Sequence, residues 1–89
     1  MEQNVPSQVL WNILFYNLIM IQVLFAERLK NLREEKGVTR EQLANALNVS
    51  IRLISYWENG KRECNFEMLM LIAKYFDCSI DYLLGRTDY

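Results

Sequence analysis

The chain has 89 residues, 52% of them hydrophobic, and its 10 basic and 11 acidic side chains give a formal net charge of -1. This length allows one small core, and the nearly neutral charge excludes a general attraction to nucleic acid, so any such contact must depend on local charge. The absence of histidine excludes cysteine-histidine catalysis, and two cysteines cannot close a zinc site, which argues against an enzyme and implies no cofactor. We expect Cys64 and Cys78 to be reduced, buried or half-buried hydrophobes, as suits the cytosol.

Residues 1–23 form a hydrophobic N-terminal extension. From Val9 to Ala26 no residue is charged, and only Asn12, Asn17 and Gln22 are polar. Because these three amides are spaced five residues apart, they point in three directions around a helix and leave no polar stripe to face water. The extension is therefore predicted to be a helix that needs either a membrane or a packing partner.

Three interpretations of the extension remain open. A membrane anchor is the least favoured, because the apolar segment barely reaches the ~20 residues that span a bilayer and contains three amides. If it does span, the basic residues that follow it would keep the rest of the chain in the cytoplasm. The segment is not a secretory signal, since no Lys or Arg precedes it. The other interpretations are an arm that packs or oligomerises, and a translation start at Met20.

A helix is expected from about Glu27 to Lys36, ending at Gly37, which can adopt the positive φ of a C-cap. Its inward side should carry Phe25, Leu29 and Leu32.

The segment from Thr39 to Gly60 has the layout of a helix-turn-helix. Thr39 and Gln42 are spaced for a capping box, so one helix should begin at Arg40, and Ser50 can cap a second helix. Between them Asn48 tolerates a left-handed turn, and the small Ala44 lets two helix backbones cross closely. The expected inner residues are Leu43, Ala44, Leu47, Ile54 and Trp57, and the second helix should end at Asn59 and Gly60.

Two further helices are predicted. Asn65 should cap a helix whose core face is Phe66, Leu69, Ile72, Ala73 and Phe76. Ser79 should cap the last helix, with Ile80, Leu83 and Leu84 turned inward and Gly85 at its end.

These motifs together carry a family resemblance. From about Phe25 to Arg86 the chain resembles the lambda-repressor-like (Cro/XRE-type) DNA-binding family, through ERLKNLREEKG, TREQLANALNVS, IRLISYWENGKR, FEMLMLIAKYF and CSIDYLLGRTD in order. The resemblance implies an all-α, five-helix domain over residues 24–86, with residues 87–89 as a tail. The chain departs from the family pattern at Arg40, Asn48, Cys64, Ile51 and Leu53, and the two apolar residues make the DNA sequence that it reads hard to infer.

The resemblance also implies which residues meet DNA. In such proteins the second helix of the motif enters the major groove. The base-facing positions correspond to Ile51, Arg52 and Tyr56, and the contacts with the DNA backbone correspond to Asn59, Lys61 and Arg62. Arg40 would lie near a phosphate or a base, and Ser50 is a cap first and a phosphate contact second. Arg33 and Glu58 stand where the family has a structural ion pair.

Two functions follow, of which we favour the first. One is a repressor that binds double-stranded DNA as a homodimer on a palindromic operator, in the cytoplasm. The local charge between Val38 and Arg62 supports it, because four basic residues outnumber two acidic ones, which leaves +2. The alternative is a protein-interaction module, antitoxin-like or tethered to a membrane, that uses Ile51, Leu53 and Tyr56 as an apolar surface.

Overall fold

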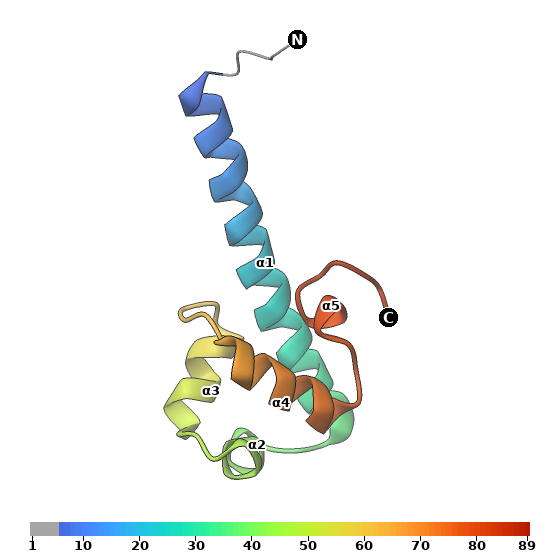
Figure 1. Cartoon of the computed structure of the whole chain (residues 1–89). Helices are drawn as coiled ribbons and strands as arrows, with labels where there is room; N and C mark the ends of the chain where they lie inside the picture. The colour runs from blue at the N-terminus through green and yellow to red at the C-terminus, as the bar shows by residue number, and fades with distance from the viewer. Residues whose placement is uncertain (1–5) are drawn as a thin grey trace.

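The computed structural model describes residues 6–89, which form five α-helices and no strand. The helices are α1 (Ser7–Lys36), α2 (Arg40–Leu47), α3 (Ile51–Glu58), α4 (Phe66–Phe76) and α5 (Ile80–Leu83). The expected all-helical architecture is therefore confirmed. In Figure 1, α2 to α5 gather around the C-terminal half of α1, and the N-terminal half of α1 projects away from them.

The long helix α1 differs from the prediction. It begins after Pro6 and continues for 30 residues to Lys36, where Gly37 ends it in the left-handed conformation at φ 75°. The expected start near Glu27 is wrong, because no glycine or proline lies between Ser7 and Lys36 to interrupt the helix. The hydrophobic extension and the first helix of the domain are thus one continuous element.

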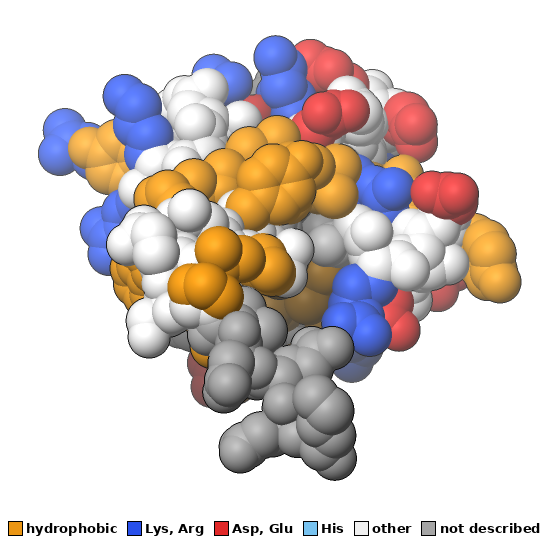
Figure 2. All heavy atoms as spheres, turned by 90° about the horizontal axis from the view of Figure 1, so that it is seen from above, with side chains coloured by type: hydrophobic (Ala, Val, Ile, Leu, Met, Phe, Trp, Pro, Cys, Tyr) orange, Lys and Arg blue, Asp and Glu red, His pale blue; other side chains and the backbone are white. Residues whose placement is uncertain are grey.

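Residues 7–19 of α1, which we call the arm, are exposed on every side. Trp11 stacks on Phe15 with ring centroids 6.3 Å apart, and both rings remain more than half exposed. Seen from above, hydrophobic side chains occupy the middle of the molecule, and charged ones lie to the left, above and to the right of them (Figure 2). By length and composition α1 is apolar enough to cross a membrane, and it is the one such helix within residues 6–89.

The core joins all five helices. Each helix contributes one large aliphatic side chain with no exposed surface: Leu29, Leu43, Ile54, Ile72 and Leu83. Trp57 is 2% exposed, and Ala44, at 1%, lies in the same cluster. Truncating one of these buried aliphatic side chains to alanine should cost about 2 to 5 kcal/mol. The core therefore fixes α3 in place against α1 and α2, the two helices with which α3 has the most contact.

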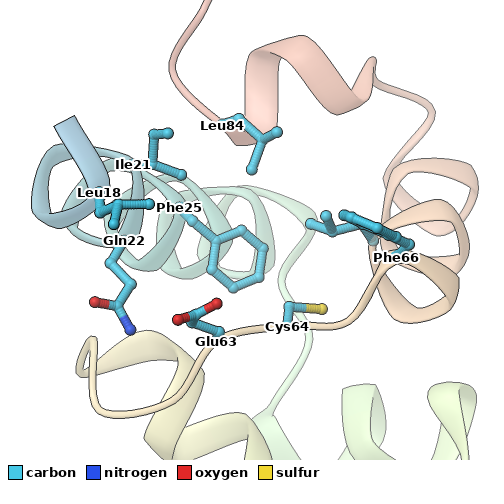
Figure 3. Close-up of a pocket in the computed structure, with 9 residues that line it drawn as sticks. Leu18, Ile21, Gln22, Phe25, Glu63, Cys64, Phe66 and Leu84 are labelled. Carbon is cyan, nitrogen blue, oxygen red and sulfur yellow. The ribbon is translucent and has the colours of Figure 1, made fainter. Parts of the chain in front are cut away.

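Five residues expected to face inward lie nearer the surface. Four of them pack against the core but are only partly buried: Leu32, Phe76, Ile80 and Leu84. Phe66 is 85% exposed, so its predicted place in the core is wrong. As the first residue of α4 it stands at the rim of a cavity of about 200 Å³ instead, with Leu18, Ile21 and Phe25 of α1 opposite (Figure 3).

The C-terminal tail is bound to α1. The guanidinium of Arg28 donates to the backbone oxygens of Tyr82 and Thr87 and lies 4.3 Å from the centroid of the Tyr82 ring. Leu24, one turn earlier, packs against Gly85. The end of the chain is therefore part of the packed domain.

Candidate nucleic-acid interface

Local capping sets the start of both helices in the helix-turn-helix. The Gln42 amide N–H donates to Thr39 Oγ1 (3.0 Å) while the Thr39 N–H donates to Gln42 Oε1 (2.8 Å), which confirms the expected capping box. Asn48 adopts the left-handed conformation at φ 58°, and Ser50 Oγ accepts from the Leu53 N–H at 3.1 Å. The hydroxyl of Ser50 thus serves as the cap of α3, as predicted.

Helix α3 has one buried and one open face. Ile54, Trp57 and Glu58 are buried, whereas Ile51 is 47% exposed and Arg52 is also exposed. Tyr56 is half-buried. The structure therefore places the three residues predicted to face bases outside the core, with Ile51 and Arg52 in the first turn of the helix.

The turn after α3 carries the residues that were predicted to contact the DNA backbone. Gly60 has φ 71°, and the Lys61 N–H donates to the Tyr56 oxygen at 2.8 Å, which closes the turn. Asn59, Lys61 and Arg62 are exposed, and Asn59 Nδ2 donates to Ser55 Oγ at 3.3 Å. Two cations and an amide thus lie next to the C-terminal end of α3.

Arg33 and Glu58 are joined by two hydrogen bonds. Arg33 Nε donates to Glu58 Oε2 at 2.6 Å and Arg33 Nη2 to Oε1 at 3.1 Å, while Arg33 Nη1 donates to the Val38 oxygen at 3.0 Å. The Glu58 side chain has no exposed surface, and that of Arg33 is 12% exposed. The hydrogen bond that Arg33 donates to Glu58 is the main reason that the pKa of Arg33 lies above its ordinary value. Both charges are accordingly satisfied inside the domain.

A third member of this network was missed by sequence reasoning. Arg40, the first residue of α2, donates from Nε to Glu58 Oε1 at 3.0 Å, and its side chain is 40% exposed. A signal for this contact exists in the sequence, because Arg40 is a cation at a helix N-terminus and Glu58 an anion at a helix C-terminus. Each has the unfavourable sign for its own helix dipole, and each compensates the other.

Burial of Glu58 changes the charge of the surface. Of the two acidic residues between Val38 and Arg62, only Glu41 is exposed, since Glu58 is buried against Arg33. Arg52, Lys61 and Arg62 are exposed, and Arg40 is partly so. The surface of the helix-turn-helix is therefore more positive than the residue count alone indicates.

The two cysteines stay free and half-buried, as predicted. Burial raises the pKa of Cys64 to about 12, and burial together with Asp77 raises the pKa of Cys78. No group of three or more Cys, Asp or Glu side chains within residues 6–89 is arranged to hold a metal ion.

Comparisons with known proteins agree with this geometry. The Helix-turn-helix family pattern matches residues 29–83. The HTH-type transcriptional activator BcrR of Enterococcus faecalis is 50% identical over 64 residues, which cover 72% of this chain and 31% of that protein. Repressor protein C2 of Salmonella phage P22 is 36% identical over 61 residues, covering 68% of this chain and 28% of that protein. The chain thus spans about a third of these curated relatives.

Solved structures show the same fold. The crystal structure of the P22 c2 repressor protein in complex with a synthetic operator matches with a TM-score of 0.67 and 33% identity, over 71% of this chain and 96% of that one. A transcriptional regulator from Listeria innocua matches with a TM-score of 0.67 and 40% identity, over 71% and 59% of the two chains. Regulators of this kind are generally cytoplasmic and generally not enzymes. The chain belongs to the Cro/XRE-type helix-turn-helix family.

Proposed function

We propose that this protein is a sequence-specific regulator of transcription that binds double-stranded DNA, acting as a repressor. The observation that carries the proposal is the charge of the helix-turn-helix surface, where Glu41 is the only exposed acid between Val38 and Arg62. Four cations are exposed or partly exposed there: Arg52 in α3, Lys61 and Arg62 after it, and Arg40 at the start of α2. Such a surface suits the phosphate backbone and the base edges of the major groove. Occupying an operator is enough to block transcription, so the DNA-binding surface alone can repress.

Base reading is assigned to the first turns of α3. Arg52 is the principal reader, because its guanidinium can bond both O6 and N7 of guanine. Ile51 packs on a thymine methyl group, and the half-exposed Tyr56 lies one turn further along the helix. These residues lie on the part of the helix that enters the groove in proteins of this fold.

Phosphate contacts are assigned to the two flanking segments. Lys61, Arg62 and Asn59 follow α3, and Arg40 opens α2, so that they hold the backbone on two sides of the reading helix. Ser50 has its hydroxyl engaged as a cap and makes at most a secondary phosphate contact. These contacts set affinity and register and carry no sequence information.

We further propose a homodimer on a palindromic operator. Helix α3 has eight residues and is thus about 12 Å long, which covers only a few base pairs. Two copies reading half-sites about 34 Å apart would supply the missing length. The related P22 c2 repressor was solved in complex with a synthetic operator, which supports DNA as the ligand.

We place the DNA-binding unit at residues 24–86 of a cytoplasmic protein and assign the arm, which is exposed on every side, to oligomerisation. The part of α1 that carries no buried residue runs from residue 7 to residue 24, and a helix of these 18 residues is about 27 Å long, just short of the ~30 Å hydrocarbon core of a bilayer. From Phe25 onward one face of α1 is buried by its own domain. A span would also have to accommodate Asn12, Asn17 and Gln22, which favours oligomerisation over membrane spanning.

A protein-interaction module has less support. That alternative required Ile51, Leu53 and Tyr56 to form one apolar surface. Leu53 packs against the core and Tyr56 is half-buried, so Ile51, at 47% exposed, is the only exposed member of the three. A single isoleucine is too little apolar area for a protein-docking surface.

A salt titration tests the proposed function. The affinity of the full chain for duplex DNA, measured by fluorescence anisotropy, should fall linearly with the logarithm of the salt concentration. Selection from a random duplex pool should then enrich a palindrome that is bound tighter by about a thousandfold or more than random DNA. Failure to bind any duplex at low salt would contradict the proposal.

A further inference from the structure

We infer that Glu58 is a positioning residue for DNA binding, which holds the guanidinium of Arg40 so that its terminal amino groups meet a phosphate. The inference rests on the proposed function. The buried carboxylate of Glu58 stabilises the domain through Arg33. The inference adds a second role for it, at the surface. It concerns three residues of three helices, Arg33 of α1, Arg40 of α2 and Glu58 of α3.

The two arginines use the same carboxylate differently. All three nitrogens of the Arg33 guanidinium donate inside the protein, two to Glu58 and one to the Val38 oxygen. Arg40 donates only from Nε within residues 6–89, so its Nη1 and Nη2 groups keep their donors for another ligand. Arg33 thus neutralises Glu58, and the trio retains the positive charge of Arg40 at a site 40% exposed.

The position of Arg40 has no explanation in helix stability alone. A cation in the first turn of a helix opposes the helix dipole. The capping box of Thr39 and Gln42 already stabilises the start of α2 without Arg40. The bond of Arg40 to Glu58, the neighbour of Asn59, ties α2 to the turn that carries the exposed Lys61 and Arg62. The partly exposed charge of Arg40 suits a phosphate. A solvent-exposed residue that is unfavourable for its own helix, as Arg40 is for α2, is typical of a functional site.

The bond between Arg40 Nε and Glu58 favours DNA binding because it reduces the entropy that the Arg40 side chain loses. A free arginine loses much side-chain freedom when it binds, and an arginine fixed at Nε has lost part of it before DNA arrives. The planar fork then offers two parallel donors to one phosphate, an arrangement that the single ammonium of lysine cannot provide while it also bonds Glu58. The geometry therefore predicts an effect of Glu58 on DNA affinity that passes through Arg40.

The test is a double-mutant cycle on the full chain with a random-sequence duplex, using Arg40→Gln, Glu58→Gln and both together, at a temperature where each variant is folded by circular dichroism. Arg40→Gln should weaken binding on the order of tenfold and lower the salt slope by about one. Glu58→Gln removes a negative charge, so a purely electrostatic role predicts tighter binding. Positioning predicts binding about threefold to tenfold weaker instead. The double variant should bind no more weakly than Arg40→Gln alone.

Arg40→Lys gives an independent test if Glu58→Gln does not fold. This variant keeps the surface charge, so the salt slope should stay the same while affinity falls about threefold to tenfold. Three outcomes would overturn the inference: tighter DNA binding by Glu58→Gln, additive effects in the double-mutant cycle, or wild-type affinity in Arg40→Lys. Because the wild type would still show salt-dependent binding in those cases, the proposed function would stand. Absence of binding by the wild type would overturn both.

Discussion

Arg52 and Lys61 are both exposed cations, but they are proposed to contact different parts of DNA. Arg52→Ala should remove a base contact worth about 1 to 3 kcal/mol and so abolish preference for the operator while random DNA is still bound. Lys61→Ala and Arg62→Ala are the matched controls, and each should weaken all sequences alike and flatten the salt slope by about one. Anisotropy on operator and random duplexes measures both effects. Equal losses on both duplexes in Arg52→Ala would contradict its role as a reader.

The buried pair of Arg33 and Glu58 should be worth far more than an exposed one. Removing Glu58 strands the charge of Arg33, and removing Arg33 leaves the buried Glu58 with only the partly exposed Arg40. Arg33→Ala or Glu58→Ala should therefore lower the free energy of unfolding on the order of 3 kcal/mol, and the double variant should cost much less than the sum. Urea denaturation measures these values. Arg86→Ala breaks the exposed pair with Asp81, 3.7 Å apart, and should cost about 0 to 1 kcal/mol. Additive losses at the buried pair would refute the coupling.

Burial of the Cys64 thiol makes a prediction about alkaline pH. Its pKa is raised from about 9 to about 12, so the folded state keeps the proton over a range in which the unfolded chain loses it. The contribution of Cys64 to stability is therefore fully present below about pH 9 and is lost as the pH rises toward 12. Urea midpoints at pH 7 and pH 10.5 should differ less for Cys64→Ala than for the wild type. An equal pH dependence in the two proteins would contradict the burial of the thiol.

At the scale of elements, Gly85 links α5 to α1. It has φ 79°, and a Cβ there would overlap Leu24. Gly37 provides a matched control, because it has φ 75° with nothing within 4 Å of its Cβ position. Gly37→Ala should cost about 1 to 2 kcal/mol from the left-handed backbone alone, and Gly85→Ala should cost clearly more because Leu24 must also move. Thermal melts of the two variants measure the difference. Equal melting temperatures would show that Leu24 and Gly85 are not in close contact.

Helix boundaries that depend on short-range chemistry were predictable from the sequence. The caps at Thr39, Ser50, Asn65 and Ser79 each bond a backbone N–H three residues ahead, so a few neighbouring residues decide where the helix begins. The predicted start of a helix near Glu27 was wrong because it had no such local signal, and α1 begins at Ser7 instead. No cap or breaker stands there, and helix formation continues through any run of residues that tolerates it.

Features that depend on tertiary placement were predictable only in part. Periodicity alone put Phe66 on the core face of α4, but its position at the first turn leaves it beyond the neighbouring helices, over the cavity beside Phe25. The Arg33 and Glu58 pair was expected through family resemblance, since 25 residues separate them in the chain. Arg40 belongs to the same network because α2 and α3 cross, and one sequence carries only an indirect electrostatic sign of that crossing.

At the scale of the whole molecule, the arm should be dispensable for folding. The buried part of α1 begins at Phe25, so a chain that starts at Met20 keeps every core residue. Such a chain should be soluble, helical and cooperative on melting by circular dichroism. A chain starting at Lys30 is the control, since it lacks Phe25, Ala26 and Leu29 and should not fold. A molten or aggregated product from the Met20 start would show that residues 7–19 complete the core.

The continuity of α1 has a mechanical consequence. The same helix carries the exposed Trp11 near one end and Arg33, which bonds Glu58 of the reading helix, near the other. No glycine or proline between them allows the helix to bend sharply. A rotation of the arm about the helix axis would therefore also rotate the domain that carries α3. A partner that binds the arm would therefore set the orientation in which α3 approaches DNA. A flexible linker at the same place would let that domain turn freely.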